Sequence, residues 1–236
     1  MAERFFAQLP NAVEIVELRG QEAHHLAIVM RKQSGDGVEL FDGAGTVAQT
    51  RVLSASKKLV ELEVQQRSYT ERPAFQLTLA TAIPKGDRFK SLVEKATEIG
   101  VSRIIPLRTE RSIVHPSDSK LAKSQQTVIE ACKQCRRNWI MEIEPQCSID
   151  QLSARTDLLD DSIKLVSDPR GRSVSKTASA FGGATKAIAV IGPEGGLSDR
   201  EVETLESHGF QRCGLGANIL RIETAGLVLS AILLHR

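Results

Sequence analysis

The sequence predicts an α/β protein with a mostly parallel sheet, preceded by a small β-rich domain. In the first 70 residues, apolar and polar side chains alternate over short runs, the pattern of half-exposed strands. From residue 74 onward, apolar runs alternate with amphipathic helical segments, which is typical of a parallel sheet covered on both faces. The chain has 236 residues, of which 41% are hydrophobic and 25% charged. It is therefore long enough for one large or two modest domains of ordinary composition.

The first domain is expected to span residues 1–70 as a small barrel. Its period-two strands are predicted at residues 12–18, 38–41 and 59–64, and its one short helix near residues 22–30. Glycine-containing turns at 34–37 and 42–45 separate the strands. The polar stretch at 65–73 is interpreted as a linker.

The second domain is expected to span residues 74–236. Strands are predicted at 75–83, 101–107, 163–166, 186–191 and 212–215. The first helix has Asp87 as its cap and Gly100 as its stop, and a longer helix covers about 119–137. Ser198 and Glu201 form a capping box for a helix that ends at Gly209. Thr224 is predicted to cap a last helix that runs to residue 235.

Two strand-to-helix loops stand out in this second half. The first, GPEGG at residues 192–196, follows the strand 186–191, and the second, at 216–223, follows the next strand. Ligands of open α/β sheets collect at the carboxyl ends of strands, where both loops are expected. The first loop lacks the glycine patterns of dinucleotide and phosphate sites, and it carries Glu194 and no lysine. A neutral or cationic planar ligand close to the backbone suits it, although a simple tight turn is the alternative.

Charge and cysteine content limit the partners. Residues 85–137 carry a net charge of +6, which indicates either a footprint for nucleic acid or a solvated helix face. Aromatic residues make up only 4% of the chain, so no stacking platform is visible. Cys132 and Cys135 have no further ligands at metal spacing and are interpreted as small apolar residues of a helix, with no metal site. Neither a membrane span nor a secretory signal is evident, which predicts a cytoplasmic protein.

The segments IGPEGGLSDRE and LGANILRIETA resemble the cofactor-binding signature of the SPOUT class of RNA methyltransferases. The whole chain is similar to the RsmE-type enzymes of that class, through residues 25–31, 41–43, 94–101, 108–112 and 130–134. The resemblance implies a PUA-like RNA-binding β-barrel at 1–70 and a SPOUT methyltransferase domain at 74–236 with a C-terminal trefoil knot. It also implies a homodimer that uses S-adenosyl-L-methionine to methylate N3 of a uridine in 16S rRNA, within the small ribosomal subunit.

The resemblance assigns residues by matching positions. The cofactor would be held by Asp168, Ile191, Gly192, Pro193, Glu194, Gly195, Leu215, Gly216, Leu220, Arg221, Thr224 and Ala225, with Pro169 and Arg170 beside Asp168 in the loop after its strand. RNA contacts are assigned to His25, Arg31, Lys85, Arg88, Arg111 and Arg137. Three positions depart from the family pattern: Asn218 replaces the usual Arg, Ile222 a common Thr, and Arg136 a frequent Gly. The first removes a cation beside the site.

The chemistry requires positioning and the loss of a proton. N3 of uridine is a poor nucleophile until its proton leaves, so a base must take the proton or a cation must stabilise the resulting charge. Arg221 is the candidate cation, and its alternative role is to pair with Glu223 or Glu194. Glu223 is either the base or a carboxylate near the helix N-terminus that interacts favourably with the helix dipole. His25 is more suited to a structural role or an RNA contact than to catalysis.

The last helix is apolar nearly all round, so covering one face cannot satisfy it. A subunit interface or the core of a knot would cover the second face.

Two other functions remain open at this stage. A non-catalytic RNA-binding ribosome assembly factor would explain the β domain and the basic segment but not the two loops. A nucleotide hydrolase is disfavoured because a phosphate loop and a carboxylate cluster are missing.

Overall fold

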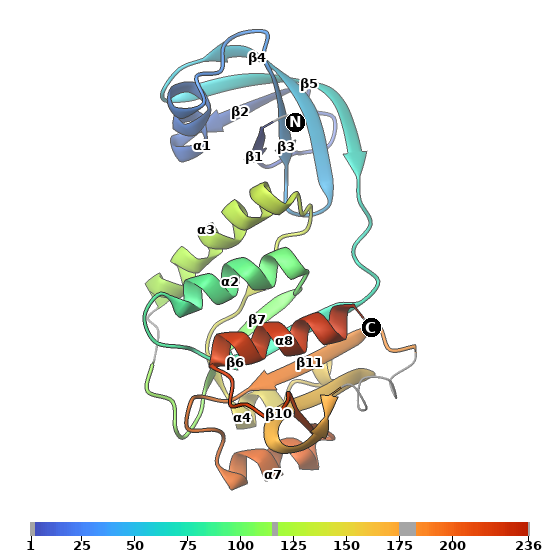
Figure 1. Ribbon diagram of the computed structural model, residues 1–236. Coiled ribbons are helices and arrows are strands. Elements are labelled where there is room, and N and C mark those ends of the chain that lie inside the picture. The colour runs from blue at the N-terminus through green and yellow to red at the C-terminus, as the bar shows by residue number, and fades with distance from the viewer. Residues whose placement is uncertain (1–2, 115–117, 175–182, 236) are drawn as a thin grey trace. The chain divides into compact units, whose positions relative to one another are not determined.

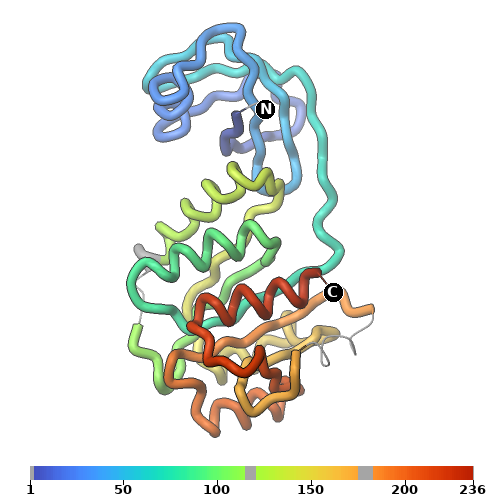
Figure 2. Tube along the Cα trace, in the orientation of Figure 1, coloured from blue at the N-terminus to red at the C-terminus, as the bar shows by residue number. Residues whose placement is uncertain are grey.

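The structure is a computed structural model that describes residues 3–114, 118–174 and 183–235. The chain forms two compact units. One unit contains Met1–Arg72 together with Cys132–Ile140, and the other contains Pro73–Ala131 and Met141–Arg236. Figures 1 and 2 trace the backbone from the N-terminal unit in blue to the C-terminal helix in red.

The first unit is built on a sheet that, in its described residues, has five strands in the order β1–β3–β4–β5–β2. All neighbouring strands are antiparallel except β1 and β3. The predicted short helix is present as α1 (Gly20–His24), which continues into a π-helical turn, η1 (His25–Val29). The strands are β1 (Arg4–Phe6), β2 (Ile15–Arg19), β3 (Gly37–Phe41), β4 (Thr46–Ala55) and β5 (Leu59–Tyr69).

Two strands of this unit, β1 and β4, were not predicted from the sequence, and a third, β5, is longer than predicted. No strand was predicted over β4, because its inward positions include Ala48 and Thr50, which are weak apolar signals; the Thr50 hydroxyl donates to the carbonyl of Val38 at 3.0 Å. β5 runs to Tyr69, so the first part of the predicted linker at 65–73 belongs to the sheet. Its residues there are mostly exposed, which is why they look like a linker in the sequence.

The first unit also takes a segment from far along the chain, Cys132–Ile140. The backbone N–H of Gly45 donates to the carbonyl of Asn138 at 3.1 Å, and the N–H of Ile140 donates to the carbonyl of Gly43 at 2.9 Å. The predicted domain ranges of 1–70 and 74–236 placed this segment in the second domain. Backbone hydrogen bonds between segments so far apart leave no periodic signal in the sequence.

The second unit contains the predicted parallel sheet. Among the described residues its strand order is β12–β10–β11–β6–β7–β8, with β9 also pairing with β7, and these pairings are parallel. β11 lies in the middle of the sheet, between β10 and β6, so its side chains from Ala187 to Ile191 are all buried. The strands are β6 (Gln76–Ala82), β7 (Arg103–Arg108), β8 (Glu142–Ile143), β9 (Cys147–Ser148), β10 (Ser162–Ser173), β11 (Lys186–Ile191) and β12 (Gln211–Gly214).

Helices cover both faces of this sheet (Figure 1). On one face, α2 (Arg88–Ile99) packs against α8 (Ile222–Leu234), which also lies on β6 and β11. On the other, apolar side chains of α4 (Ile149–Ser153), α5 (Thr156–Leu159) and α7 (Asp199–Ser207) share a core with the strands. The predicted long helix is α3 (Asp118–Cys135).

The helix ends test the predicted capping residues. α2 stops at Gly100, in a left-handed conformation with φ 103°, as predicted, but the Asp87 side chain makes no capping hydrogen bond. The capping box of Ser198 at the start of α7 is confirmed. The predicted cap Thr224 is wrong, because α8 begins two residues earlier, at Ile222. Ile222 is buried, so its packing starts the helix before the polar residue is reached.

The last helix is covered on one side by the sheet and α2. Its buried residues include Ala225, Leu229 and Leu233, whereas the half-buried ones are Leu227, Val228, Ala231, Ile232 and Leu234. The sheet and α2 therefore do not fully cover the second face of α8, which the sequence predicted to be buried. In the described part of the chain, no helix is both long enough and apolar enough to cross a membrane.

Candidate functional site

A cavity of about 590 Å³ opens in the second unit where β10, β11 and β12 end. Small-molecule sites commonly have volumes of this size, and this edge of a parallel sheet is where they form. Residues predicted to bind a cofactor or to lie beside it line most of the wall: Asp168, Pro169, Arg170, Ile191, Gly192, Pro193, Glu194, Gly195, Leu215, Gly216, Leu220 and Ala225.

The sequence missed part of the wall. These further lining residues are Arg111, Ser167, Gly196, Leu197, Asp199, Val202, Ala217, Asn218, Ile219 and Ile222. All of them except Val202 and Arg111 lie within four positions of a residue that was predicted to bind the cofactor. Closeness in sequence to those residues is therefore the signal that could have identified them. Arg221 and Thr224, predicted to hold the cofactor, do not belong to the wall that the described residues form. Both side chains are exposed, Arg221 at the N-cap of α8 and Thr224 in its first turn.

The loop between β11 and α7 forms one side of the cavity. A Cβ atom on Gly192 would lie 3.0 Å from Cγ and 3.1 Å from the backbone N of Leu197, so a larger residue there would have to push Leu197 aside. The N–H of Gly196 donates to the carbonyl of Pro193 at 2.8 Å, and Gly196 has φ +71°. The glycines thus allow a tight turn that brings bare backbone to the cavity.

The loop between β12 and α8 forms the opposite side. Gly216 has φ +127°, and most of the loop from Gly216 to Ile219 is exposed. The side chain of Ile219 is 91% exposed at the mouth of the cavity. Asn218, which departs from the family pattern, also lines this side.

An irregular stretch of β10 forms the third wall. The sequence placed Asp168 and Arg170 in a loop after a strand ending at Val166, but β10 continues to Ser173 with a register shift against β12. Asp168 is buried and accepts hydrogen bonds from the Arg170 backbone N–H at 2.8 Å and from Nη2 at 2.9 Å. These bonds from Arg170 hold the pKa of Asp168 below its usual value, so it is a carboxylate.

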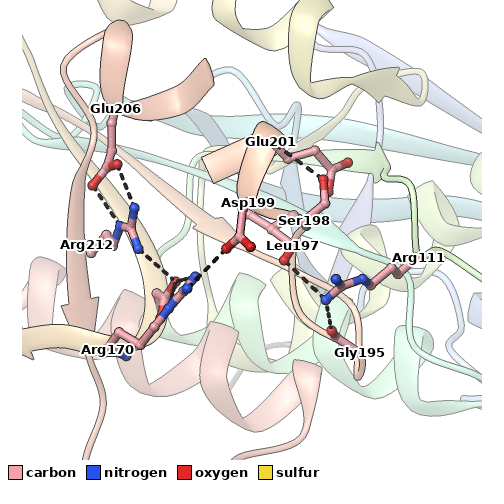
Figure 3. Close-up of polar contacts among 10 residues, drawn as sticks. Arg111, Arg170, Gly195, Leu197, Ser198, Asp199, Glu201, Glu206 and Arg212 are labelled. Carbon is pink, nitrogen blue, oxygen red and sulfur yellow. Dashed lines mark hydrogen bonds and ion pairs between the residues drawn. The ribbon is translucent and has the colours of Figure 1, made fainter. Parts of the chain in front are cut away.

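A chain of ion pairs continues from Asp168 along this wall (Figure 3). Arg170 reaches from β10 to Asp199, the first residue of α7, with its Nη1 3.1 Å from Oδ1. Arg212 of β12 lies 3.9 Å from Asp168 and donates two hydrogen bonds to Glu206 at 2.7 Å. The network joins β10, β12 and α7 beside the cavity.

Arg111 joins the first loop to the turn after β7 (Figure 3). Its Nη1 donates to the carbonyl of Gly195 at 2.8 Å and to that of Leu197 at 3.4 Å. The backbone N–H of Glu110 donates to Oε1 of Glu201, whose other oxygen accepts from the backbone of the α7 cap. The structure therefore places Arg111, which the sequence assigned to RNA, in contact with the wall of the cavity.

Arg88, rather than Arg221, is the arginine that lies close to both Glu194 and Glu223. Its guanidinium lies 3.8 Å from Glu194 in the first loop and 3.9 Å from Oε1 of Glu223 in α8. Oε2 of Glu223 is buried and has no hydrogen-bond partner among the described residues. The side chain of Arg221 makes no hydrogen bond or ion pair with any described residue and is exposed. The predicted alternative, in which Arg221 pairs with Glu223 or Glu194, is therefore wrong.

The remaining predicted RNA residues are spread over both units. Lys85 is exposed in the second unit, just before α2. His25, Arg31 and Arg137 belong to the first unit. The His25 ring packs edge-to-face on Phe5 at 5.7 Å, which supports a structural role for it. Arg137 is half-buried, and desolvation lowers the pKa of its guanidinium.

The cysteines do not form a reactive or metal-binding centre within the described residues. Cys132 is buried and Cys135 half-buried on α3. Cys213, next to the cavity loop on β12, is buried, and this burial raises the pKa of its thiol to about 12. Its sulfur stays protonated near neutral pH and is not a nucleophile.

Comparison with known families and proteins identifies the two halves of the chain. Residues 70–234 match the model of an RNA methyltransferase domain, and residues 18–65 match that of an RNA methyltransferase PUA domain. The chain is 32% identical to the ribosomal RNA small subunit methyltransferase E of Bacillus subtilis, over 98% of this chain and 95% of that protein. It is 31% identical to the Synechocystis protein of the same name, over 98% and 77%.

Solved structures of similar proteins share the whole fold. A putative methyltransferase from Legionella pneumophila, in complex with the bound cofactor SAM, has a TM-score of 0.87 at 29% identity, with 99% of this chain and 97% of that chain covered. A ribosomal RNA small subunit methyltransferase E from Neisseria gonorrhoeae, bound to S-adenosyl methionine, has a TM-score of 0.87 at 30% identity, with 98% and 96% covered.

Proposed function

This chain belongs to the RNA methyltransferase family, and we propose that it uses S-adenosylmethionine to methylate N3 of a specific uridine in 16S rRNA. The observation that carries the proposal is the cavity between the two strand-to-helix loops, lined by backbone of Gly192, Gly195 and Gly216. These are the loops through which the sequence resembles the SPOUT class. Relatives with the same overall fold are solved with this cofactor bound.

The residues present fit S-adenosylmethionine. The ionisable side chains of the wall are Asp168, Glu194, Asp199, Arg111 and Arg170, which carry a net charge of −1. The cofactor has a sulfonium, an ammonium and a carboxylate group, so its net charge is +1. Arg111 is bound to loop carbonyls and Arg170 to Asp168 and Asp199, so neither arginine leaves an unpaired positive charge facing the cofactor's sulfonium.

The cofactor would be held by backbone and apolar groups rather than by ion pairs. We assign this role to Ile191, Gly192, Pro193, Glu194 and Gly195 of the first loop, to Leu215, Gly216 and Leu220 of the second, to Ala225 of α8, and to Asp168. Backbone N–H and C=O groups can reach a planar adenine where no side chain intervenes. When bound, the cofactor supplies an electrophilic methyl group next to the acceptor base.

The chain's own residues prepare the acceptor. Methyl transfer needs the acceptor nitrogen within roughly 3–3.5 Å of the methyl carbon, so positioning is the main requirement. Arg221 is unengaged at the edge of the second loop, and its guanidinium fork can stabilise negative charge on the uracil carbonyl oxygens. Glu223 is the candidate proton acceptor, because its buried Oε2 has no hydrogen-bond partner among the described residues.

The half-buried face of α8 supports a homodimer. Leu227, Ile232 and Leu234 lie on it with apolar neighbours, and a second copy of the chain would cover them. We further propose that the C-terminal segment forms a trefoil knot, as in the SPOUT class, and that the 16S rRNA is modified in the cytoplasm within the small ribosomal subunit. Sedimentation of the purified chain measures the dimer directly.

The experiment that tests the activity has two parts. Calorimetric titration in the presence of a chelator should show binding of S-adenosylmethionine without added metal. Mass mapping of 16S rRNA from cells that lack the gene should then show the loss of one methyl group on a uridine, restored by the wild-type gene. If neither the binding nor the lost methyl group is observed, a non-catalytic assembly factor becomes the better interpretation.

Replacement of Arg111 should weaken cofactor binding. Arg111→Ala removes two charge-assisted hydrogen bonds to loop carbonyls, and we expect the dissociation constant for S-adenosylmethionine to rise about ten-fold. Arg111→Lys should recover part of the affinity, because a single ammonium group can still reach one carbonyl. Calorimetry measures both variants, with Arg108→Ala, which replaces an exposed arginine at the end of β7, as the matched control.

The same variants separate a loop role from an RNA contact. If Arg111 positions the loop, amide hydrogen exchange at Gly196 should accelerate in Arg111→Ala without any ligand, and RNA affinity should stay near wild type. Reduced RNA affinity with unchanged cofactor affinity would instead support the RNA contact that the sequence suggested.

A further inference from the structure

The only tryptophan and the only tyrosine of the chain lie side by side in the first unit. The ring centroids of Tyr69 and Trp139 are 6.2 Å apart and their planes meet at 77°, an edge-to-face arrangement. Tyr69, at the end of β5, is 58% exposed, and Trp139 is half-buried. Because 69 positions separate them in sequence, only the fold creates this pair.

The two rings are held in place by the surrounding chain. The indole N–H of Trp139 donates to the carbonyl of Thr70 at 2.9 Å, and the side-chain amide of Asn138 donates to the Thr70 hydroxyl at 2.7 Å. A Cβ atom on Gly45 would lie 2.8 Å from the Tyr69 ring and 2.9 Å from the Trp139 ring. Aromatic side chains fixed before binding lose little conformational freedom when a ligand arrives.

A cation completes the group. The guanidinium carbon of Arg72 lies 5.6 Å from the centroid of the Trp139 ring, within the range of a cation–π interaction. A guanidinium at such a position can also meet phosphate or stack on a base. Arg72 itself is exposed.

We propose that Tyr69, Trp139 and Arg72 form a platform on which unpaired bases of single-stranded RNA stack. The proposal rests on the proposed function in that RNA is the substrate, but it places a contact outside the cavity. All three residues also lie outside residues 18–65, which match the PUA-domain model. Stacking on aromatic rings tolerates any base, so the platform would hold a flanking strand rather than select the target uridine.

The surroundings favour RNA over a protein partner. Thr70 and Asn138 place polar groups beside the rings. A protein interface of ordinary size buries about 800 Å² on each partner around an apolar centre. The other large apolar side chains exposed on the described part of this unit are in other elements: Ile15, Ile28, Val29 and Leu53.

The sole tryptophan allows a direct test on the full-length protein. A single-stranded 12-nucleotide RNA of mixed sequence should quench the intrinsic fluorescence of Trp139, whereas the same sequence as a duplex should not. Tyr69→Ala should lower the affinity for the single strand about ten-fold. Tyr69→Phe, which keeps the ring, should bind as wild type, and Leu53→Ala, at another exposed site of the same unit, should have no effect.

Three results would overturn the proposal. The first is retention of the RNA by wild-type protein on a filter with no change in Trp139 emission. The second is full RNA affinity of Tyr69→Ala, and the third is conversion of a dimer to monomers by Tyr69→Ala. The last result would assign the surface to a second copy of the chain. Affinity for S-adenosylmethionine, measured in parallel, distinguishes failure of the proposed function from failure of the platform. Wild-type protein that does not bind the cofactor contradicts the proposed function. Normal cofactor and RNA binding by Tyr69→Ala contradicts the platform alone.

Discussion

The Gly195→Val variant is expected to fold normally and to lose S-adenosylmethionine binding. A Cβ atom at Gly195 would lie 3.5 Å from Cδ of Arg111, an ordinary van der Waals contact, and φ there is not left-handed. Gly195 is also exposed, so the valine disturbs no core. Its branched side chain nevertheless stands where the cofactor must approach backbone. We expect the dissociation constant to rise at least about a hundred-fold, or roughly 2.7 kcal/mol.

Calorimetry and thermal melting measure these two properties of Gly195→Val separately. Gly37→Val is the matched control, because Gly37 is an exposed glycine of β3 whose Cβ would lie 3.9 Å from the carbonyl oxygen of Thr50. That control should bind the cofactor as wild type does. Normal cofactor binding by Gly195→Val would show that this loop does not form the cofactor site.

The Gly171→Ala variant is expected to destabilise the second unit. A Cβ atom at Gly171 of β10 would lie 2.6 Å from the backbone C of Arg212 and 2.6 Å from the backbone N of Cys213. Neither atom can rotate away, so β10 and β12 must separate. Overpacking of this kind costs about 2–3 kcal/mol, which lowers the melting temperature of a chain this long by roughly 4–12 °C.

A graded series checks this assignment by thermal melting. At Gly214, which faces Gly171 from β12, a Cβ atom would lie 3.0 Å from the Gly171 carbonyl oxygen, so Gly214→Ala should cost less. Gly37→Ala should have little effect on the melting temperature. Equal melting temperatures for Gly171→Ala and wild type would mean that the two strands are not as close as the structure has them.

The layout of the second unit follows from local patterns. The apolar run of β11 and the Ser198 and Glu201 capping box each depend on residues a few positions apart. Such short-range preferences act on the chain before it folds, which is why they are visible in the sequence. The parallel sheet, the helix α7 and the glycine loop after β11 were predictable for this reason.

The contents of the cavity wall were only partly predictable. The two loops supplied its glycines, but Arg111 arrives from a turn that follows β7, and Asp168 and Arg170 sit in an irregular part of β10. The start of α8 was misplaced because the burial of Ile222 outweighs the capping preference of Thr224. Each of these outcomes depends on contacts between segments far apart in sequence.

By itself, the sequence determined the alternation of the main strands and helices in the second unit, the parallel sheet and the pair of loops from which the family resemblance comes. Only the tertiary structure decided that Arg88, rather than Arg221, stands between the two acidic side chains, and that Tyr69 meets Trp139. The physical reason is range. Propensity and periodicity act between neighbours along the chain, whereas ion pairs and ring contacts are set by where the packed backbone places distant residues.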